Sequence, residues 1–282
     1  MFFLYGYGGT RKTFMWSTLS LALRSKGKIV LTVASSGITS LLLPGGRTAH
    51  SKFRIPIPTM DNSICNIEQG SEVTELLKVV DLIIWDEAPM AHKFCFEALD
   101  RTLNDIMKHH KKSNSIFGGK VVVFGGDFRQ ILLVIPKGTR SDIVNATINA
   151  SYLWEHCQVM TLTKNMRLLQ TGLETNTTSE IQQFSDWIVK LGDGLLCEPN
   201  DGVVDIEIPP QFLILDFSDP IKAIVSSTYP GLLQNYSNAN FLKSRAILAS
   251  RIETVEEINE HILSLIPGTY LYIFTHFIYI MF

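Results

Sequence analysis

The chain has 282 residues, of which 46% are hydrophobic and 18% charged, and its formal net charge is −2. This length allows one large domain or two modest ones, and without global basicity any contact to nucleic acid would need a local patch. The four cysteines form no C-x-x-C pair, which argues against zinc and favours reduced, intracellular thiols.

The first predicted elements are a strand, a glycine-rich turn and a helix, a combination typical of a phosphate-binding P-loop. The apolar run Phe2–Tyr5 precedes the turn, and residues 14–26 are expected to be helical. In a P-loop, backbone N–H groups surround the phosphates, a lysine reaches the β and γ oxygens, and a hydroxyl group holds Mg²⁺. The candidate phosphate-binding residues are Gly6, Gly8, Gly9, Thr10, Arg11, Lys12 and Thr13. Arg11 stands where the pattern G-x-x-x-x-G-K-[ST] requires glycine, so an active loop and an inactivated loop are both open.

A strand at 29–34 is predicted next, and a short helix at 38–43 follows before a Pro-Gly-Gly break. Residues 47–54 then carry four basic or potentially basic side chains and one aromatic side chain. A solvated loop is the ordinary interpretation of such a cluster. Alternatively, the cations contact the phosphates of single-stranded DNA while His50 or Phe53 stacks on a base. These residues alone leave both interpretations open.

An acidic pair follows the predicted strand 82–85, whose continuous apolar run is typical of a parallel sheet covered on both faces. Asp86 and Glu87 would lie at the carboxyl end of that strand, where open α/β sheets bind ligands. There the first carboxylate can hold Mg²⁺ and the second can orient or deprotonate the attacking water. A turn with two solvated acids is the alternative, but the βαβ pattern after the glycine-rich turn favours the functional interpretation.

Another buried strand, 121–124, leads into the segment Gly125–Gln130. Its paired glycines allow a ligand to approach the backbone closely, and the amide of Gln130 suits a sensor of the γ-phosphate. Strands that alternate with helices predict βαβ units and a parallel sheet. Further strands are expected at 159–162, 212–215 and 245–249, further helices at 93–111, 180–191, 220–229 and 253–265, and an irregular segment at 55–70.

Neither end of the sequence predicts export or membrane insertion. No basic segment precedes the N-terminal apolar run, so a signal peptide is not expected. Residues 269–282 are almost entirely apolar and aromatic. A membrane span needs about 20 apolar residues, more than this run provides. A buried strand or a tail without a partner is therefore favoured over a membrane anchor.

Six short motifs identify a family when they are taken together. They are Gly6–Thr13, Ser35–Ile38, Arg47–Ser51, Asp86–Met90, Gly125–Gln130 and Leu162–Arg167. This set resembles the petite-integration-frequency DNA helicases, in the form carried by Helitron transposons. The resemblance extends from residue 1 to Gly268, and its specificity lies in the combination of motifs.

The resemblance implies a P-loop NTPase of the α/β class that contains a RecA-like parallel sheet with helices on both faces. It implies a RecA-like ATP-binding domain at 1–160, a partial second RecA-like domain at 161–268, and an apolar tail of unknown structure at 269–282. The implied activity is ATP hydrolysis coupled to 5′-to-3′ movement along single-stranded DNA, with ATP and Mg²⁺ as cofactors. A nuclear location is also implied.

The resemblance also assigns roles to individual residues. Lys12 would hold the β- and γ-phosphates, Thr13 and Asp86 would hold Mg²⁺, Glu87 would be the catalytic base, Gln130 the γ-phosphate sensor, and Arg167 an arginine finger from the second domain. The residues expected to contact single-stranded DNA are Ser36, Thr48, His50, Lys52 and Phe53.

Four departures from the family pattern qualify these expectations. Arg11 replaces a glycine, Leu133 replaces a proline, an adenine-recognising segment is not found before Met1, and the later motifs of the second domain are not found. We therefore expect a chain truncated at both ends that binds ATP weakly and does not unwind duplex DNA. A non-catalytic remnant that binds nucleotide or DNA weakly is the alternative to a helicase. The basic segment and the Gly125–Gln130 motif argue against a third possibility, a P-loop NTPase that acts on something other than DNA.

Overall fold

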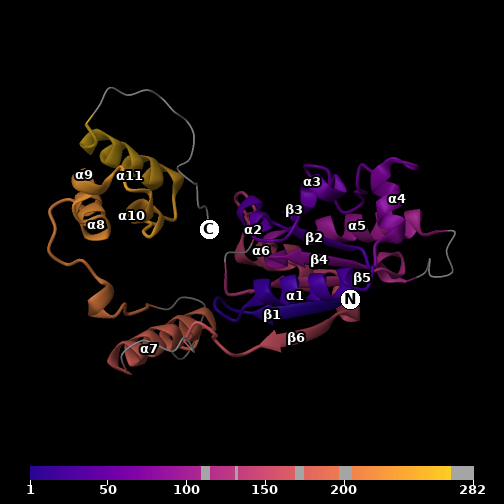
Figure 1. Ribbon diagram of the computed structural model, residues 1–282, viewed down its shortest axis with the longest axis horizontal. Coiled ribbons are helices and arrows are strands. Elements are labelled where there is room, and N and C mark those ends of the chain that lie inside the picture. The colour runs from indigo at the N-terminus through magenta and orange to yellow at the C-terminus, as the bar shows by residue number, and fades with distance from the viewer. Residues whose placement is uncertain (109–114, 131–132, 169–174, 197–204, 268–282) are drawn as a thin grey trace. The chain divides into compact units, whose positions relative to one another are not determined.

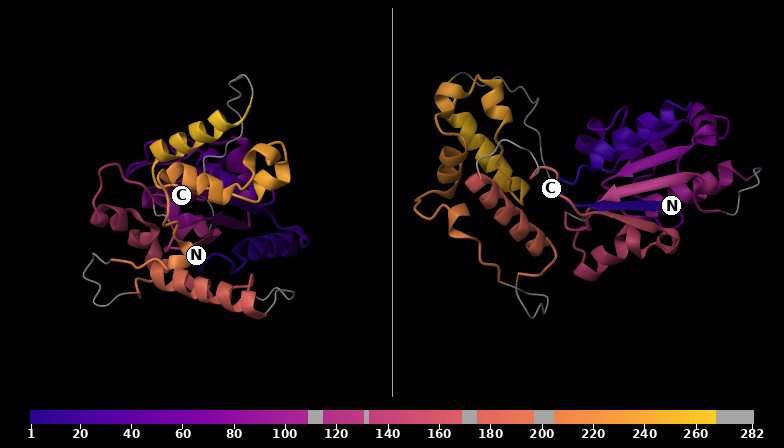
Figure 2. Two further views of the ribbon diagram at one scale, coloured as in Figure 1. Left: turned by 90° about the vertical axis from the view of Figure 1, so that its left-hand side faces the viewer. Right: turned by 60° about the horizontal axis from the view of Figure 1, so that its bottom comes forward.

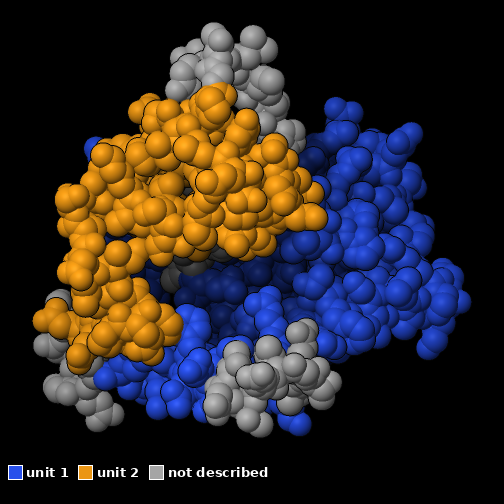
Figure 3. Space-filling model, turned by 60° about the vertical axis from the view of Figure 1, so that its left-hand side comes forward, with its two compact units in different colours: residues 1–198 blue, residues 199–282 orange. Residues whose placement is uncertain are grey.

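The computed structural model describes residues 1–108, 115–130, 133–168, 175–196 and 205–267. By its internal contacts the chain divides into two compact units, Met1–Glu198 and Pro199–Phe282, which are coloured separately in Figure 3. The expected boundary after residue 160 falls inside a strand that pairs with the first strand of the chain, so the contacts divide the chain later. The division into two RecA-like domains stays a prediction, and the apolar tail at 269–282 lies outside the described residues.

The first unit is built on one six-stranded, wholly parallel sheet, whose strands lie side by side in Figures 1 and 2. The strands are β1 (Phe2–Gly6), β2 (Val30–Ala34), β3 (Arg47–Thr48), β4 (Leu82–Asp86), β5 (Val121–Gly126) and β6 (Gln158–Leu162). Their order in the sheet is β3-β2-β4-β5-β1-β6. Because all strands run in one direction, their carboxyl ends lie on the same side of the sheet, called its carboxyl edge here. The segments that follow β1, β4, β5 and β6 meet at this edge.

Helices connect the strands and cover the sheet. Those of the first unit are α1 (Lys12–Arg24), α2 (Gly37–Leu41), α3 (Ala49–Phe53), α4 (Glu72–Val79), α5 (Lys93–Ile106), α6 (Arg140–Ala146) and α7 (Thr175–Gly192), with short 3₁₀ turns at 88–90, 116–119, 148–150 and 152–156. The helices expected from the apolar spacing at 14–26, 93–111 and 180–191 are confirmed as α1, α5 and α7, with shifted ends. No helix among the described residues is long and apolar enough to cross a bilayer.

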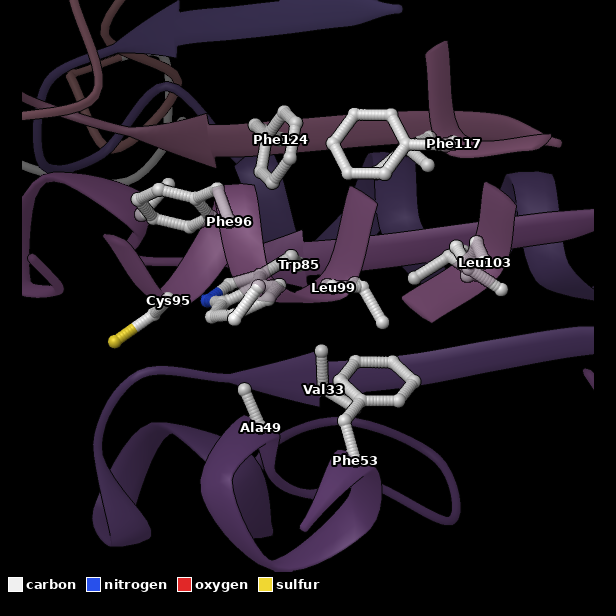
Figure 4. Packing of buried hydrophobic residues seen from close by; sticks show 14 of the residues in the cluster. Val33, Ala49, Phe53, Trp85, Cys95, Phe96, Leu99, Leu103, Phe117 and Phe124 are labelled. Carbon is white, nitrogen blue, oxygen red and sulfur yellow. The ribbon is translucent and has the colours of Figure 1, made fainter. Parts of the chain in front are cut away.

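The central strands are mostly apolar, and both faces of the sheet are covered. Successive side chains of a strand point to opposite faces. On one face Trp85 packs against Phe96 of α5, with ring centroids 4.7 Å apart, and against Phe124 of β5 (Figure 4). On the other face Ile84 belongs to a second buried cluster that includes Trp16 of α1. This arrangement confirms the expectation of a parallel sheet with helices on both faces.

The irregular segment 55–70, as expected, contains neither helix nor strand and is fastened to α5 by hydrogen bonds. The buried hydroxyl of Thr102 accepts from the backbone N–H of Cys65 at 2.9 Å and donates to the carbonyl of Ala98 at 2.7 Å. Arg101 adds a bond from Nε to the carbonyl of Ser63 at 2.9 Å. These bonds satisfy backbone groups that the segment cannot pair within itself.

Replacing Thr102 with valine tests this anchor, because valine keeps the shape and removes the hydroxyl. The buried N–H of Cys65 then loses its acceptor, and we expect the free energy of unfolding to fall by about 1–3 kcal/mol. Urea denaturation with an unchanged m-value measures the loss. The matched control is Thr18→Val at an exposed position of α1, which should stay within about 0.5 kcal/mol of wild type. Equal stabilities for the two variants would show that the Thr102 hydroxyl does not anchor the segment.

The second unit contains only helices and turns in its described part. Its helices are α8 (Pro220–Thr228), α9 (Leu232–Asn235), α10 (Ala239–Lys243) and α11 (Ile252–Leu265), with a 3₁₀ turn at 210–212. The helices expected at 220–229 and 253–265 are confirmed, and the carboxylate of Asp219 caps α8 by accepting from the N–H groups of Ile221 and Lys222. Val225, Leu232 and Ile258 form its small core.

The strands expected at 212–215 and 245–249 are wrong. Residues 213–215 and 245–249 are irregular, and the side chains of Leu215 and Leu248 are more than half exposed. A strand needs a neighbour to pair its backbone groups, and the described part of the second unit offers none. An apolar run of strand length therefore does not become a strand here.

Candidate nucleotide site and DNA-contact residues

The glycine-rich turn after β1 forms a loop in which the lysine side chain hydrogen-bonds to the backbone of the loop. Lys12, the first residue of α1, is 8% exposed, and its Nζ donates to the carbonyl of Gly6 at 2.5 Å. The hydroxyl of Thr10 donates to the carbonyl of Tyr7 at 2.7 Å. Thr13 lies one residue further along the helix and is exposed. The loop therefore gathers a buried ammonium group, the N-terminus of α1 and an exposed hydroxyl, which is the donor set of a phosphate site.

Gly9 is required by its surroundings as well as by its backbone. Its φ of 93° lies in the region that favours glycine, and a Cβ there would come within 2.3 Å of Oδ1 of Asn165. The carbonyl of Gly9 accepts from the N–H of Met166 at 3.0 Å. The P-loop thus packs directly against the segment that follows β6.

Arg11 adopts the conformation of the glycine that the P-loop pattern demands. Its φ and ψ are 62° and 39°, in the left-handed region, and it is the exposed N-cap residue of α1. A residue with a Cβ is destabilised there by roughly 1–2 kcal/mol. Position 11 therefore has a positive φ in this loop although it carries an arginine.

Asp86, the last residue of β4, has the properties of a cation ligand. It is 2% exposed, and its Oδ1 has no hydrogen-bond partner among the described residues. Burial raises the pKa of Asp86, while the neighbouring Trp16 indole and Lys12 ammonium act against that shift. The indole Nε1 of Trp16 is also without a partner of normal geometry among the described residues. An orphaned carboxylate oxygen beside a phosphate-binding loop fits Mg²⁺, which prefers oxygen ligands.

Glu87 directly follows Asp86 and is suited to proton transfer. Burial, the charge of Asp86 and the charge of Asp127 raise the pKa of Glu87 to about 7, and Lys12 acts against them. Its φ of 53° turns the chain sharply after the strand, and a 3₁₀ turn at 88–90 follows. A general base works best when its pKa lies near the working pH. The structure thus favours a functional acidic pair over two solvated acids.

The segment after β5 forms a turn around Asp127. This side chain is 3% exposed, its Oδ1 accepts from the N–H of Arg129 at 3.0 Å, and its carbonyl accepts from the N–H of Gln130 at 3.1 Å. Gln130 is partly exposed at the edge of the sheet where Asp86 and Glu87 lie. A sensor role for its amide stays a prediction.

The paired glycines of this segment pack closely against side chains of the first unit. A Cβ on Gly125 would come within 2.3 Å of Cζ2 of Trp16, and a Cβ on Gly126 within 2.3 Å of Cδ of Pro89. The glycines make room for two packed side chains, and the approach of a ligand to this backbone stays a prediction. The pattern gives no means of distinguishing these two uses, because both need a backbone without a Cβ.

Arg167 lies in the first unit, in the segment that contacts the P-loop. Its N–H donates to Oδ1 of Asn165 at 3.1 Å, and its side chain is exposed. The expectation that it comes from the second domain assumed a boundary after residue 160. By internal contacts Arg167 belongs with β1 and β6, so the first unit alone supplies all the candidate catalytic residues.

Of the expected DNA contacts, all but the fully buried Phe53 are partly buried. Ser36 and Thr48 use their hydroxyl groups to cap α2 and α3, by accepting from the N–H groups of Thr39 and Ser51. Lys52 is half-buried with no ion pair described. Ser36 lies two residues after β2 and Thr48 is the last residue of β3, which places both at the same edge of the sheet as the nucleotide site.

Phe53 does not fit the role expected of it, whereas the stacking role of His50 stays a prediction. Phe53 is fully buried, with its ring centroid 6.0 Å from that of Trp85, so stacking of Phe53 on a base is wrong (Figure 4). Its position at the end of α3 turns it into the core, where an aromatic side chain gains most from burial. His50 is half-buried, and burial lowers its pKa; its Nε2 lies 3.7 Å from Sγ of Cys95.

A hollow of about 420 Å³ in the second unit was not predicted from the sequence. Val225, Tyr229, Leu232, His261 and Leu265 are among the residues that line it. It lies between α8, α9 and α11, and Lys222 and Ser226 are among its polar lining residues.

A family model described as PIF1-like helicase matches residues 1–202. The chain belongs to the PIF1-like helicase family. It is 32% identical over 144 residues to the ATP-dependent DNA helicase PIF4 of Trypanosoma brucei brucei, and 30% identical over 177 residues to the ATP-dependent DNA helicase Pif1 of Campylobacter jejuni. These matches cover 50% and 60% of this chain but 17% and 36% of the relatives. This PIF1-like chain thus spans well under half of the length of either relative.

Solved structures support the same assignment. Bacteroides Pif1 bound to single-stranded DNA has a TM-score of 0.52 and 25% identity, covering 68% of this chain and 42% of that one. Bacteroides Pif1 in complex with ADP-AlF4 has a TM-score of 0.51 and 25% identity, covering 70% and 43%. The expected family and the expected RecA-like α/β fold class are confirmed. Membership of the Helitron type stays a prediction.

Proposed function

We propose that this chain binds ATP with Mg²⁺ in the loop between β1 and α1, as the motor part of a helicase that moves 5′-to-3′ on single-stranded DNA. One observation supports this most strongly: the buried Lys12 of the loop lies beside the acidic pair Asp86 and Glu87. The relatives are named ATP-dependent DNA helicases, and one structural neighbour was crystallised with ADP-AlF4. We also propose a nuclear location, on the family resemblance alone.

In the proposed mechanism, the protein positions the triphosphate and one water molecule. Lys12 leaves the carbonyl of Gly6 and binds the β and γ oxygens, while α1 directs its N–H groups at the phosphates. Thr13 and Asp86 would hold Mg²⁺, which neutralises the charge that develops on the phosphates. Glu87 accepts a proton from the attacking water. Gln130 and Arg167 contact the γ-phosphate, where charge accumulates as the bond to the leaving group breaks.

A second candidate function is favoured by the backbone of Arg11. A nest of N–H groups binds phosphate best when nothing obstructs its closure, and an arginine at φ 62° places a long side chain at that point. The alternative is a chain with the family fold that binds nucleotide or DNA weakly and turns over little ATP. Measured affinity for a non-hydrolysable ATP analogue with Mg²⁺ separates the two functions. Micromolar binding supports the motor, whereas no saturation at millimolar analogue supports the remnant.

For DNA, we propose that the basic residues at 47–54 contact the phosphates of a single strand. The position of β3 and α3 supports this proposal, because it places the segment at the carboxyl edge of the sheet, where the nucleotide site lies. The structural neighbour bound to single-stranded DNA is consistent with such a partner. Base stacking by Phe53 is not part of the proposal.

Replacing Lys52 with alanine tests the DNA contact. We expect weaker binding to an oligonucleotide of any sequence, and a dependence of log Kd on log salt that is shallower by roughly 0.7, because one fewer phosphate counterion is released. Fluorescence anisotropy at several salt concentrations measures both quantities. The control is Lys26→Ala, an exposed lysine that precedes β2 at the opposite edge of the sheet. If Lys26→Ala and Lys52→Ala change the slope equally, the contact is non-specific and the proposed surface is wrong.

A further inference from the structure

The guanidinium group of Arg129 joins the turn after β5 to the end of α7. Its Nε and Nη2 donate to the two carboxylate oxygens of Asp193 at 2.6 Å and 3.2 Å. The rings of Tyr5 and Tyr7 each lie 5.5 Å from its central carbon. Bidentate pairing and aromatic contacts are interactions that an arginine makes and a lysine does not reproduce.

The end of α7 is shaped to receive this side chain. Gly192, the last residue of the helix, would bring a Cβ within 3.0 Å of Cδ of Arg129, so glycine lets the arginine lie against the helix end. Asp193 follows at once, with its N–H bonded to the carbonyl of Val189 at 2.9 Å. Nη1 of Arg129 has no hydrogen-bond partner among the described residues. The described side-chain hydrogen bonds of the guanidinium group therefore all go to Asp193.

A second bond fastens α7 to the P-loop side of the site. Nδ2 of Asn165 donates to Oγ of Ser185, in the middle of α7, at 3.2 Å. The same asparagine accepts the N–H of Arg167 and lies against Gly9. The two contacts, Arg129–Asp193 and Asn165–Ser185, are called the α7 clamp below. Their partners on the site side are neighbours of Gln130 and of Arg167.

We propose that the α7 clamp makes Arg129 and Asp193 positioning residues, which hold the turn 127–130 so that Gln130 meets the γ-phosphate. This inference rests on the proposed nucleotide site. Because Arg129 precedes Gln130 and its N–H is bound to Asp127, the side chain held by α7 determines where that amide lies. An element far along the chain thereby sets the preference of the site for a triphosphate over a diphosphate. Whatever moves α7 would change that preference.

The test compares two nucleotides, because only one of them carries a γ-phosphate. In the full chain, Asp193→Asn removes the charge without a change of shape. We expect the affinity for a non-hydrolysable ATP analogue to fall roughly three- to tenfold, the scale on which contacting residues couple, while the affinity for ADP stays constant. Asp193→Glu, which keeps the charge, should recover part of the loss. If the ion pair had only a structural role, the affinities for the ATP analogue and for ADP would fall equally, and that result overturns the inference.

The control is Asp81→Asn, which makes the same substitution in a surface ion pair, Lys28–Asp81 at 2.9 Å. It should leave both affinities unchanged. Hydrogen exchange of α7 in the nucleotide-free chain provides an independent arm, in which Asp193→Asn should exchange faster and Asp81→Asn should not. Unchanged exchange in Asp193→Asn overturns the clamp itself. If the wild-type chain binds neither nucleotide, the proposed function fails, and the γ-phosphate role of the clamp fails with it. Faster exchange of α7 in Asp193→Asn would then still show that the clamp holds α7.

Discussion

Replacing Arg11 with glycine is expected to tighten the binding of ATP with Mg²⁺ by about tenfold, equivalent to ~1.4 kcal/mol. The backbone already follows the path of a P-loop, with φ 62° at this position, so the substitution needs no rearrangement of the fold. The gain comes from removing a side chain where N–H groups close around the phosphates. Titration with a fluorescent, non-hydrolysable ATP analogue measures it, and turnover should rise in parallel.

A matched control separates this local effect from backbone strain. Arg54 is also an exposed arginine with a positive φ, 51°, at the end of α3. Relief of strain should stabilise both glycine variants by at most ~1 kcal/mol, because the greater entropy of glycine in the unfolded chain opposes the gain. Only Arg11→Gly should also bind nucleotide more tightly. A wild-type chain that binds and hydrolyses ATP as well as Arg11→Gly would contradict the prediction.

In the Arg11→Gly chain, Glu87→Gln is expected to reduce ATP turnover by roughly 10²–10⁴-fold, the usual contribution of a positioned general base. Glutamine has the size of glutamate but cannot accept the proton of the attacking water. The affinity for the ATP analogue should not fall, since binding relies on Lys12 and on the N–H groups of α1. Loss of a negative charge beside the phosphates could only favour the anion.

The measurements are steady-state phosphate release and analogue binding on the same preparations. Glu75→Gln is the control, because Glu75 pairs with Lys78 on the surface of α4. It should keep the turnover of its parent. If Glu87→Gln hydrolyses ATP as fast as Arg11→Gly alone, then Glu87 is not the base, and its elevated pKa would be a consequence of burial without a catalytic role.

The motifs of the sequence predicted which residues lie together at the carboxyl edge of the sheet, because their spacing and the parallel sheet obey the same rule. Residues at the carboxyl ends of parallel strands meet at one edge of the sheet. The proximity of Lys12, Asp86 and Gln130 could therefore be predicted from the three apolar runs that precede them. The continuous run Leu82–Trp85 also predicted burial on both faces, which the packing of Trp85 and Ile84 confirms. Local pattern and global topology agree at these positions.

The failures have a common physical cause, since each depends on what lies opposite a residue in space. Phe53 stands among basic residues in the sequence, but the turn of α3 directs it to Trp85. The packing of Trp16 against Gly125 could not be read from the sequence. The pairing of Arg129 with Asp193 joins residues far apart in the chain, and no local pattern marks it. Residues 245–249 have strand composition but no partner strand.

The bond from Lys12 to the carbonyl of Gly6 competes with phosphate for the same ammonium group. A nucleotide must exchange that hydrogen bond for one to phosphate, so the measured affinity is a difference between two bound states of the same ammonium group. Free inorganic phosphate offers the lysine a single anion and little else. A triphosphate adds the N–H groups of α1 and the metal. The loop thus distinguishes a triphosphate from phosphate by the number of simultaneous contacts. A ligand that makes few contacts does not displace the bond between Lys12 and Gly6.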